Sequence, residues 1–134
     1  MPPKNDPPDG AKRTRILIVD DDPSMLVLLP KILTRRGFDS ATAADADTAE
    51  KTLEGESFEA VVMDLQMPAR DGFSLAEAVR KRWPDTRIIF VSAYDSEAMR
   101  KKALSLGADA FLAKPIGVEE LIAHLRGPKV AAGQ

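Results

Sequence analysis

Acidic, hydroxyl and ammonium side chains follow four apolar runs of this sequence. Asp20 and Asp21 follow ILIV, Asp64 follows VVM, Ser92 follows IIFV and Lys114 follows FLA. Neighbouring carboxylates repel one another and resist desolvation unless a positive charge lies among them. Oxygen ligands without sulfur favour Mg²⁺, a hard cation that tolerates retained water and a phosphate. With one carboxylate as nucleophile, such a site suits phosphoryl transfer.

These side chains can act together if the runs that carry them are neighbouring strands. Five stretches predict strands, at residues 15–20, 40–44, 59–64, 87–92 and 110–114, and the pattern is weakest at 40–44. The runs ILIV and IIFV lack polar alternation, which is typical of strands that are covered on both faces.

The stretches between the strands predict five helices, at residues 23–36, 47–54, 72–82, 96–106 and 118–126. Asp22 favours the start of the first helix as its N-cap, and Gly37 favours its end. Asp47 and Glu50 have the spacing of a capping box for the second helix. Pro30 is expected to kink the first helix, because proline lacks the N–H that a helix interior requires.

The alternation of strand and helix, repeated five times, predicts an α/β fold. Each gap between strand ends holds one helix and its loops, which favours a single doubly wound parallel five-stranded sheet with five helices on both faces. In such sheets ligands bind outside the carboxyl ends of the strands. The polar residues named above are therefore expected to meet at one rim.

Composition narrows the class of protein. The chain has 134 residues, 44% hydrophobic and 30% charged, which is one domain of ordinary globular composition. It has no cysteine, so a disulfide framework and a thiolate zinc site are excluded, and a cytoplasmic location is the simplest expectation. A net charge of -2 disfavours direct nucleic-acid binding. No apolar stretch approaches the length of a membrane span.

Domain boundaries follow from the same patterns. Residues 1–14 are rich in proline and poor in large apolar residues, which predicts a flexible tail. The domain is expected at 15–126, followed by a short C-terminal tail at 127–134. Because no output domain is visible after the last helix, we expect either a stand-alone regulator or a fragment of a longer one.

Four motifs resemble the receiver domain of two-component response regulators. They are IVDDD at 18–22, VVMDLQMPARDG at 61–72, VSAY at 91–94 and AKP at 113–115, and the resemblance covers about residues 15–126. It implies a flavodoxin-like sheet with strand order 2-1-3-4-5. It also implies that Asp64 accepts a phosphoryl group from a sensor histidine kinase or a histidine phosphotransfer protein. Asp20, Asp21, Asp64 and the backbone carbonyl of Gln66 would hold Mg²⁺.

The resemblance implies further roles near the rim. Ser92 would bond the phosphoryl group, and Lys114 would pair with it. Phe111 stands at the aromatic switch position, and the bond before Pro115 is expected to be cis, a form that is rare at proline in general. Gln66 and Tyr94 would both flank the phosphoryl group. Their side chains are expected to hinder an attacking water and so to lengthen the lifetime of the phosphorylated protein.

The resemblance also implies partners. The fourth helix, fifth strand and fifth helix often form the surface that binds a downstream protein in this family, and a phosphorylation-dependent dimer is possible there. Residues 100–102, RKK, belong to that fourth helix, although such a run is usually a solvated face. No direct contact with nucleic acid or with a membrane is expected.

Alternatives to a phosphorylated switch remain. A Mg²⁺-dependent aspartyl phosphatase would want a second acid two residues after its nucleophile, where this chain has Gln66. A flavodoxin-like mononucleotide binder would want a loop rich in Gly, Ser or Thr after the first strand, where DDDPS presents carboxylates. A pseudo-receiver that acts purely as an interaction module is also possible. The sequence favours the receiver, regulatory rather than enzymatic, over all three.

Overall fold

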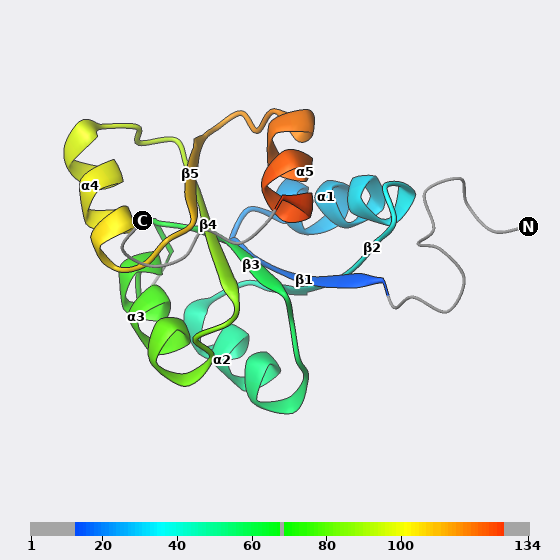
Figure 1. Ribbon diagram of the computed structural model, residues 1–134, viewed down its shortest axis with the longest axis horizontal. Coiled ribbons are helices and arrows are strands. Elements are labelled where there is room, and N and C mark those ends of the chain that lie inside the picture. Colours follow the sequence, from blue (N-terminus) through cyan, green and yellow to red (C-terminus); the bar gives the residue numbers. More distant parts are fainter. Residues whose placement is uncertain (1–12, 68, 128–134) are drawn as a thin grey trace, which may run out of the picture.

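The five strands form one parallel sheet, as the sequence predicts. The computed structural model describes residues 13–67 and 69–127. The strands are β1 (Thr14–Val19), β2 (Phe38–Ala43), β3 (Ala60–Asp64), β4 (Arg87–Ser92) and β5 (Ala110–Ala113). They pair in parallel in the order β2-β1-β3-β4-β5, which confirms the expected topology (Figure 1).

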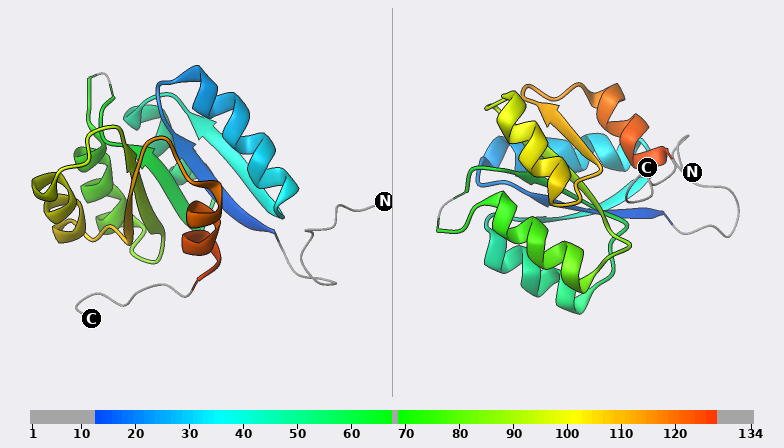
Figure 2. Two further views of the ribbon diagram at one scale, coloured as in Figure 1. Left: turned by 90° about the horizontal axis from the view of Figure 1, so that it is seen from above. Right: turned by 60° about the vertical axis from the view of Figure 1, so that its left-hand side comes forward.

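Helices cover both faces of this sheet. They are α1 (Pro23–Arg35), α2 (Ala46–Gly55), α3 (Gly72–Arg82), α4 (Glu97–Ser105) and α5 (Val118–Arg126). Helices α1 and α5 pack on one face, and α2, α3 and α4 pack on the other, as the views in Figures 1 and 2 show. None of the helices within 13–67 and 69–127 is long and apolar enough to cross a membrane.

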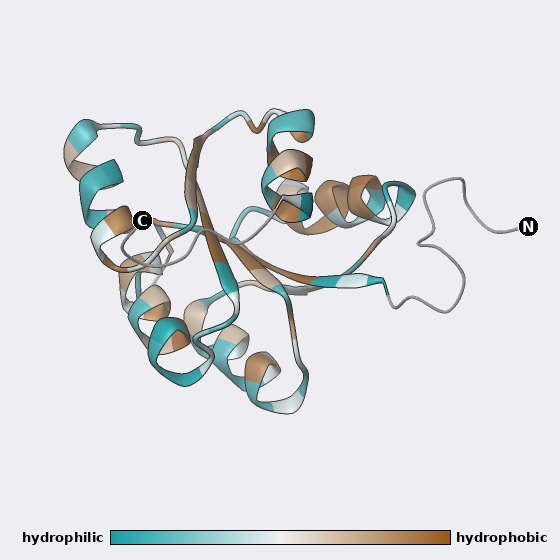
Figure 3. Ribbon diagram, viewed as in Figure 1, coloured by the Kyte–Doolittle hydropathy of each residue, from teal (hydrophilic) through white to brown (hydrophobic). Residues whose placement is uncertain are grey.

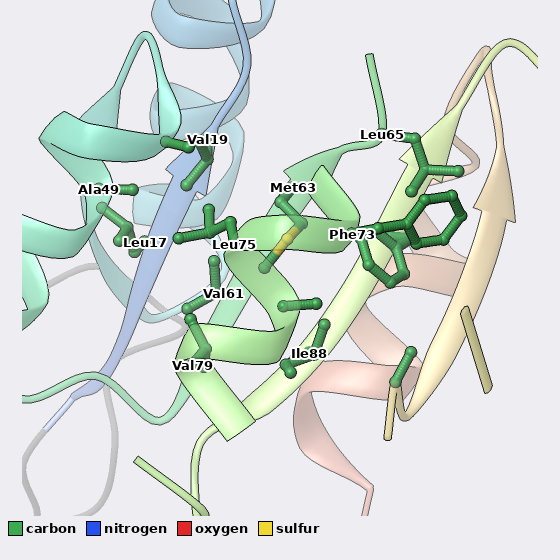
Figure 4. Close-up of a cluster of buried hydrophobic side chains, with 14 of the residues drawn as sticks. Leu17, Val19, Ala49, Val61, Met63, Leu65, Phe73, Leu75, Val79 and Ile88 are labelled. Atoms are coloured by element: carbon green, nitrogen blue, oxygen red, sulfur yellow. The ribbon is translucent and has the colours of Figure 1, made fainter. Parts of the chain in front are cut away.

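The core is divided into two clusters by the alternation of side chains along each strand. Leu17 and Val19 of β1 face α2 and α3, whereas Ile16 and Ile18 face α1 and α5. Because both faces are covered, the middle of the sheet is apolar without interruption (Figure 3). Figure 4 shows the first cluster, in which Phe73 of α3 packs beside strand residues. This rigid base fixes where the strand ends lie.

Capping decides where the helices begin. Asp22 caps α1 as predicted, since its side chain accepts a hydrogen bond from the Ser24 N–H at 2.9 Å. The capping box predicted at Asp47 is wrong. Asp45 caps α2 instead, accepting from the Thr48 N–H at 2.7 Å, because Asp45 has the extended backbone that an N-cap requires.

Other boundaries differ from the predicted ones by small amounts. Helix α2 includes Gly55, and β2 begins at Phe38, two residues before the weak 40–44 pattern. Helix α1 continues through Pro30 to Arg35. The predicted terminal tails lie almost wholly outside the described residues, although Thr14, placed in the first tail, begins β1.

Candidate functional site

The carboxyl ends of β1, β3 and β5 bring three charged side chains into contact. Lys114, which directly follows β5, donates from Nζ to Asp20 Oδ2 at 2.9 Å and to Asp64 Oδ2 at 3.0 Å. The three residues are far apart in the sequence and meet because parallel strands all end at the same edge of the sheet. The predicted convergence of these side chains at one rim is therefore present.

The polar oxygens of the rim are oriented by the backbone that follows them. In each case an N–H two residues later donates to the side-chain oxygen, which is the pattern of a tight polar turn. These bonds are Asp22 N–H to Asp20 Oδ1 at 2.9 Å, Gln66 N–H to Asp64 Oδ1 at 3.1 Å and Tyr94 N–H to Ser92 Oγ at 3.0 Å. The Oδ2 atoms of Asp20 and Asp64, which bind Lys114, are therefore held in defined directions.

Three carboxylates can contribute to a cation site. One oxygen each of Asp20, Asp21 and Asp64 lies within 4.8 Å of the others. Asp20 is 1% exposed and Asp64 is 8% exposed, whereas Asp21 is exposed to solvent. Carboxylate oxygens with one open side fit a hard divalent cation that keeps part of its water shell.

Burial and charge perturb the two central groups. Burial raises the pKa of the Asp64 carboxyl and outweighs the hydrogen bonds from the Gln66 N–H and Lys114, which lower it. Burial alone would lower the pKa of Lys114, but its bonds to Asp20 and Asp64 outweigh burial and raise it. The carboxylates thus hold Lys114 charged, while Asp64 lacks full compensation for its own charge.

Ser92 is fully buried at the end of β4 and is tied to the end of β5. Its carbonyl accepts a hydrogen bond from the Lys114 N–H at 2.8 Å. The next peptide bond, Lys114–Pro115, is cis, as the resemblance implied. The backbone at Ser92 is therefore hydrogen-bonded directly to the backbone at Lys114, which holds the hydroxyl and the ammonium on adjacent strand ends.

Gly72 is required by a close approach of two backbone segments. A Cβ at this position would lie 2.4 Å from the carbonyl oxygen of Asp64, which is closer than real Cβ contacts. The Gly72 N–H also donates to the Leu65 carbonyl at 2.9 Å. The glycine of the MPARDG motif therefore allows α3 to begin directly against the end of β3.

Phe111, the predicted switch residue, is 7% exposed. Its ring lies 6.4 Å from that of Phe90, and the guanidinium of Arg100 stands over it at 5.0 Å. Arg100 Nη1 also donates to the Phe111 carbonyl at 3.2 Å, and Arg100 pairs with Asp95. A basic run such as 100–102 usually predicts a solvated face, and no local signal in the sequence indicates that Arg100 contacts the aromatic ring of Phe111.

Gln66 and Tyr94 differ in how they stand beside the site. Gln66 and Asp21 line a groove between the β3–α3 loop and α4, to which Met99 also contributes. The Tyr94 side chain is 57% exposed, although its N–H contacts the Ser92 hydroxyl. The groove gives a route from solvent to the carboxylates.

Comparison with known proteins places the chain in a family. Residues 16–126 match the response regulator receiver domain. The chain belongs to the response regulator receiver family. The transcriptional regulatory protein TcrA of Mycobacterium tuberculosis is 37% identical to it over 112 residues, which are 84% of this chain and 44% of TcrA. The chain thus spans less than half the length of that relative.

Solved receiver structures have the same fold. A Burkholderia pseudomallei response regulator, crystallised with a phosphorylated aspartic acid, calcium ion and citrate, is 34% identical with a TM-score of 0.79, over 84% of this chain and 66% of that one. The chemotaxis protein CheY4 of Vibrio cholerae is 27% identical with a TM-score of 0.81, over 86% of this chain and 98% of that one. The receiver family and its regulatory place in two-component signalling are therefore established for this chain.

Proposed function

We propose that this receiver is a phosphorylation-dependent switch in which Asp64 accepts the phosphoryl group. The observation that carries the proposal is the contact of Lys114 with both Asp20 and Asp64, at 2.9 and 3.0 Å, at the carboxyl edge of the sheet. In this pair the buried carboxylate of Asp64 provides the nucleophile, and the ammonium of Lys114 provides a cation for the phosphoryl oxygens.

The reaction is a displacement at phosphorus. An oxygen of the Asp64 carboxylate forms the new P–O bond, the P–N bond to the donor histidine breaks, and its electron pair stays on the imidazole nitrogen. The N–H of Gln66 holds the other carboxylate oxygen, which orients the nucleophile. Lys114 is placed to pair with a phosphoryl oxygen once its bond to Asp64 is lost.

The donor set fits Mg²⁺. Asp20, Asp21, Asp64 and the backbone carbonyl of Gln66 would hold the ion, since all four offer hard oxygen atoms. When bound, Mg²⁺ neutralises charge on the transferring group. The calcium ion in the Burkholderia structure is consistent with an acidic cation site in a related receiver.

The switch would run through Ser92 and Phe111. An acyl phosphate adds negative charge and acceptor oxygens at the rim, and the Ser92 hydroxyl can turn from the Tyr94 N–H to donate to them. Phe111 lies within β5, the strand that pairs with the strand of Ser92, and is covered by Arg100, a residue of α4. A change at the rim would thus alter the face formed by α4, β5 and α5.

Protein partners follow from this proposal. A sensor histidine kinase or a histidine phosphotransfer protein would be the donor, and a downstream protein would bind the α4–β5–α5 face, where a phosphorylation-dependent dimer is an alternative. Helix α1, which borders the rim, exposes Val27 and Leu28 at 53% and 57%. Exposed apolar side chains on a helix that borders the rim suit the docking of a protein donor.

Two competing functions fit the residues of the site less well. An aspartyl phosphatase would need an acid where Gln66 stands, so the receiver is favoured over it. A pseudo-receiver would not accept phosphate, whereas the carboxylates, Ser92 and Lys114 make this site chemically competent.

Intact mass spectrometry tests the proposal. The protein is incubated with Mg²⁺ and acetyl phosphate, alongside Asp64→Asn, a sample with EDTA, and Asp85→Asn as a matched control. Asp85 is an exposed aspartate that precedes β4, at the opposite end of the sheet. We expect one phosphoryl group that requires both Asp64 and Mg²⁺. Absence of an adduct, while another receiver is labelled, would favour the pseudo-receiver.

A further inference from the structure

Arg70 ties the loop that carries the site to a neighbouring helix. It lies between β3 and α3, and its side chain reaches α2. Arg70 Nη1 donates to Asp47 Oδ1 at 3.0 Å, and Nη2 forms an ion pair with Glu50. Its Nε donates to Ser74 Oγ at 2.9 Å. The planar guanidinium therefore bridges α2, the loop and the first turn of α3.

Ala69, which precedes Arg70 in the β3–α3 loop, has an unfavourable backbone conformation. Ala69 has φ of 67°, in the left-handed region, where the Cβ of an L-residue comes too close to the following carbonyl oxygen. Such a conformation persists where surrounding contacts hold it. Arg70 is the next residue, so its bonds to α2 act directly on the strained segment.

The same loop presents groups to the carboxylates. The Gln66 N–H holds the Asp64 carboxylate, and the Gln66 carbonyl is a proposed ligand of Mg²⁺. The loop is closed at its base by the Gly72 N–H, which donates to the Leu65 carbonyl. A shift of the loop would therefore move the Gln66 carbonyl relative to Asp64.

The anchor on α2 is partly protected from solvent. The side chains of Arg70 and Glu50 are 27% and 22% exposed, so their ion pair is screened less than a fully exposed one. The other oxygen of Glu50 pairs with Arg82 Nη1 at 3.2 Å, and Arg82 also binds Glu54 at 2.7 Å. Glu50 thus forms ion pairs with two arginines, Arg70 of the loop and Arg82 at the end of α3.

We propose that Arg70 is a positioning residue for the divalent cation. By fixing the loop to α2, it sets the place of the Gln66 carbonyl, and it thereby raises the affinity for Mg²⁺ and the rate of Asp64 phosphorylation at limiting Mg²⁺. This inference rests on the proposed function of the site.

Electrostatics alone predicts the opposite sign. A guanidinium near a dication repels it, so removal of the positive charge would strengthen Mg²⁺ binding. A positioning role predicts weaker binding after the same removal. The direction of the change therefore separates the two effects.

The chain offers a matched control in Arg82. Arg70→Ala and Arg82→Ala each remove one positive charge and an ion pair with Glu50, but Arg82 belongs to the last turn of α3 and not to the loop. The Kd for Mg²⁺ is obtained for each variant from the rise of its own unfolding free energy with Mg²⁺ concentration. This readout does not depend on phosphorylation, and it corrects for any change in the metal-free stability.

We expect Arg70→Ala to raise the Kd for Mg²⁺ about tenfold, as for other residues that orient metal ligands. Arg82→Ala is expected to leave the Kd for Mg²⁺ unchanged within about twofold. Arg70→Lys should have a Kd between those of the wild type and Arg70→Ala, because lysine keeps the positive charge but lacks the planar guanidinium that bridges several acceptors. Labelling by acetyl phosphate should be slow in Arg70→Ala at limiting Mg²⁺ and recover at saturating Mg²⁺.

Three results would overturn the inference. They are an unchanged or lower Kd in Arg70→Ala, an equal rise in Arg82→Ala, and a labelling rate that stays low at saturating Mg²⁺. The proposed function fails separately: in that case the wild type itself neither gains stability from Mg²⁺ nor takes up phosphate.

Discussion

Replacing Asp64 by asparagine should stabilise the metal-free protein. The change keeps the shape of the side chain and an oxygen that can accept from the Gln66 N–H. It removes one of three carboxylates whose oxygens lie within 4.8 Å of one another, while Lys114 keeps its bond to Asp20. The variant therefore loses a charge that the folded state holds at a cost.

The magnitude follows from the distances. At an effective dielectric constant of about 20, repulsion at 4.8 Å is about 3.5 kcal/mol for the buried Asp20 and less for Asp21, which is exposed to solvent. The attraction of Lys114 at 3.0 Å is about 5.5 kcal/mol. Attraction thus exceeds the repulsion from Asp20 by about 2 kcal/mol. The burial of the Asp64 carboxylate costs more than this difference, which is why its pKa is raised. We expect the unfolding free energy to rise by about 1–2 kcal/mol.

Urea unfolding in EDTA, near neutral pH and at low salt, measures this difference. Asp85→Asn, in which an exposed aspartate is changed, serves as the control. The raised pKa of Asp64 means that its ionised form is the costly one, so the advantage of Asp64→Asn is full above that pKa. This stability advantage should shrink as the pH falls through the raised pKa, because the wild-type Asp64 carboxyl then becomes neutral as well.

Magnesium should reverse the order. At a concentration of about 100 times its Kd, a ligand adds about 2.7 kcal/mol to the stability of the protein that binds it. The wild type is expected to gain this, and Asp64→Asn to gain less because it has lost one charged ligand. A variant less stable than the wild type in EDTA would refute the reasoning, since the Lys114 ion pair would then outweigh the cost of burying the Asp64 charge.

Four further predictions concern the frame of the site and its chemistry. Gly72→Ala should destabilise the fold by about 1–3 kcal/mol and slow labelling by acetyl phosphate, because the added Cβ would press on the carbonyl at the end of β3. Pro30→Ala should raise the unfolding free energy by about 1–2 kcal/mol, since the helical N–H returns although the unfolded chain gains freedom. Asp45→Ala should lower it by about 1 kcal/mol through loss of the α2 cap, measured by the same urea unfolding. Gln66→Ala and Tyr94→Ala should each shorten the lifetime of the phosphorylated protein, followed by mass spectrometry after removal of the donor.

Each of these predictions has a contrary outcome. Normal stability of Gly72→Ala would mean that α3 can move away from β3 at little cost. A less stable Pro30→Ala would show that proline makes packing contacts worth more than the missing hydrogen bond. An unchanged Asp45→Ala would mean that another group caps α2. Unaltered lifetimes would show that neither side chain hinders the attacking water.

The sequence by itself determined that the sheet is parallel and where its polar rim lies, whereas the strand order followed from the resemblance to receiver domains. Runs such as ILIV and IIFV, with one helix between successive strands, leave few arrangements other than a doubly wound sheet. The polar residues at the carboxyl ends of parallel strands must share one edge of the sheet, and the sequence alone therefore groups Asp20, Asp64 and Lys114, which are in contact in the structure. Glycine and proline positions likewise marked most helix ends.

Tertiary structure alone decided the contacts that cross between elements. The start of α2 was misjudged because Asp45 and Asp47 are equally good caps locally, and the choice between them depends on the backbone angles that packing imposes. Arg70 and Arg100 had no local pattern to distinguish them from surface arginines, since their partners on α2 and β5 are distant in sequence. Long, flexible side chains contact their partners only once the fold has brought the two elements together. The periodicity of the sequence therefore does not predict these contacts.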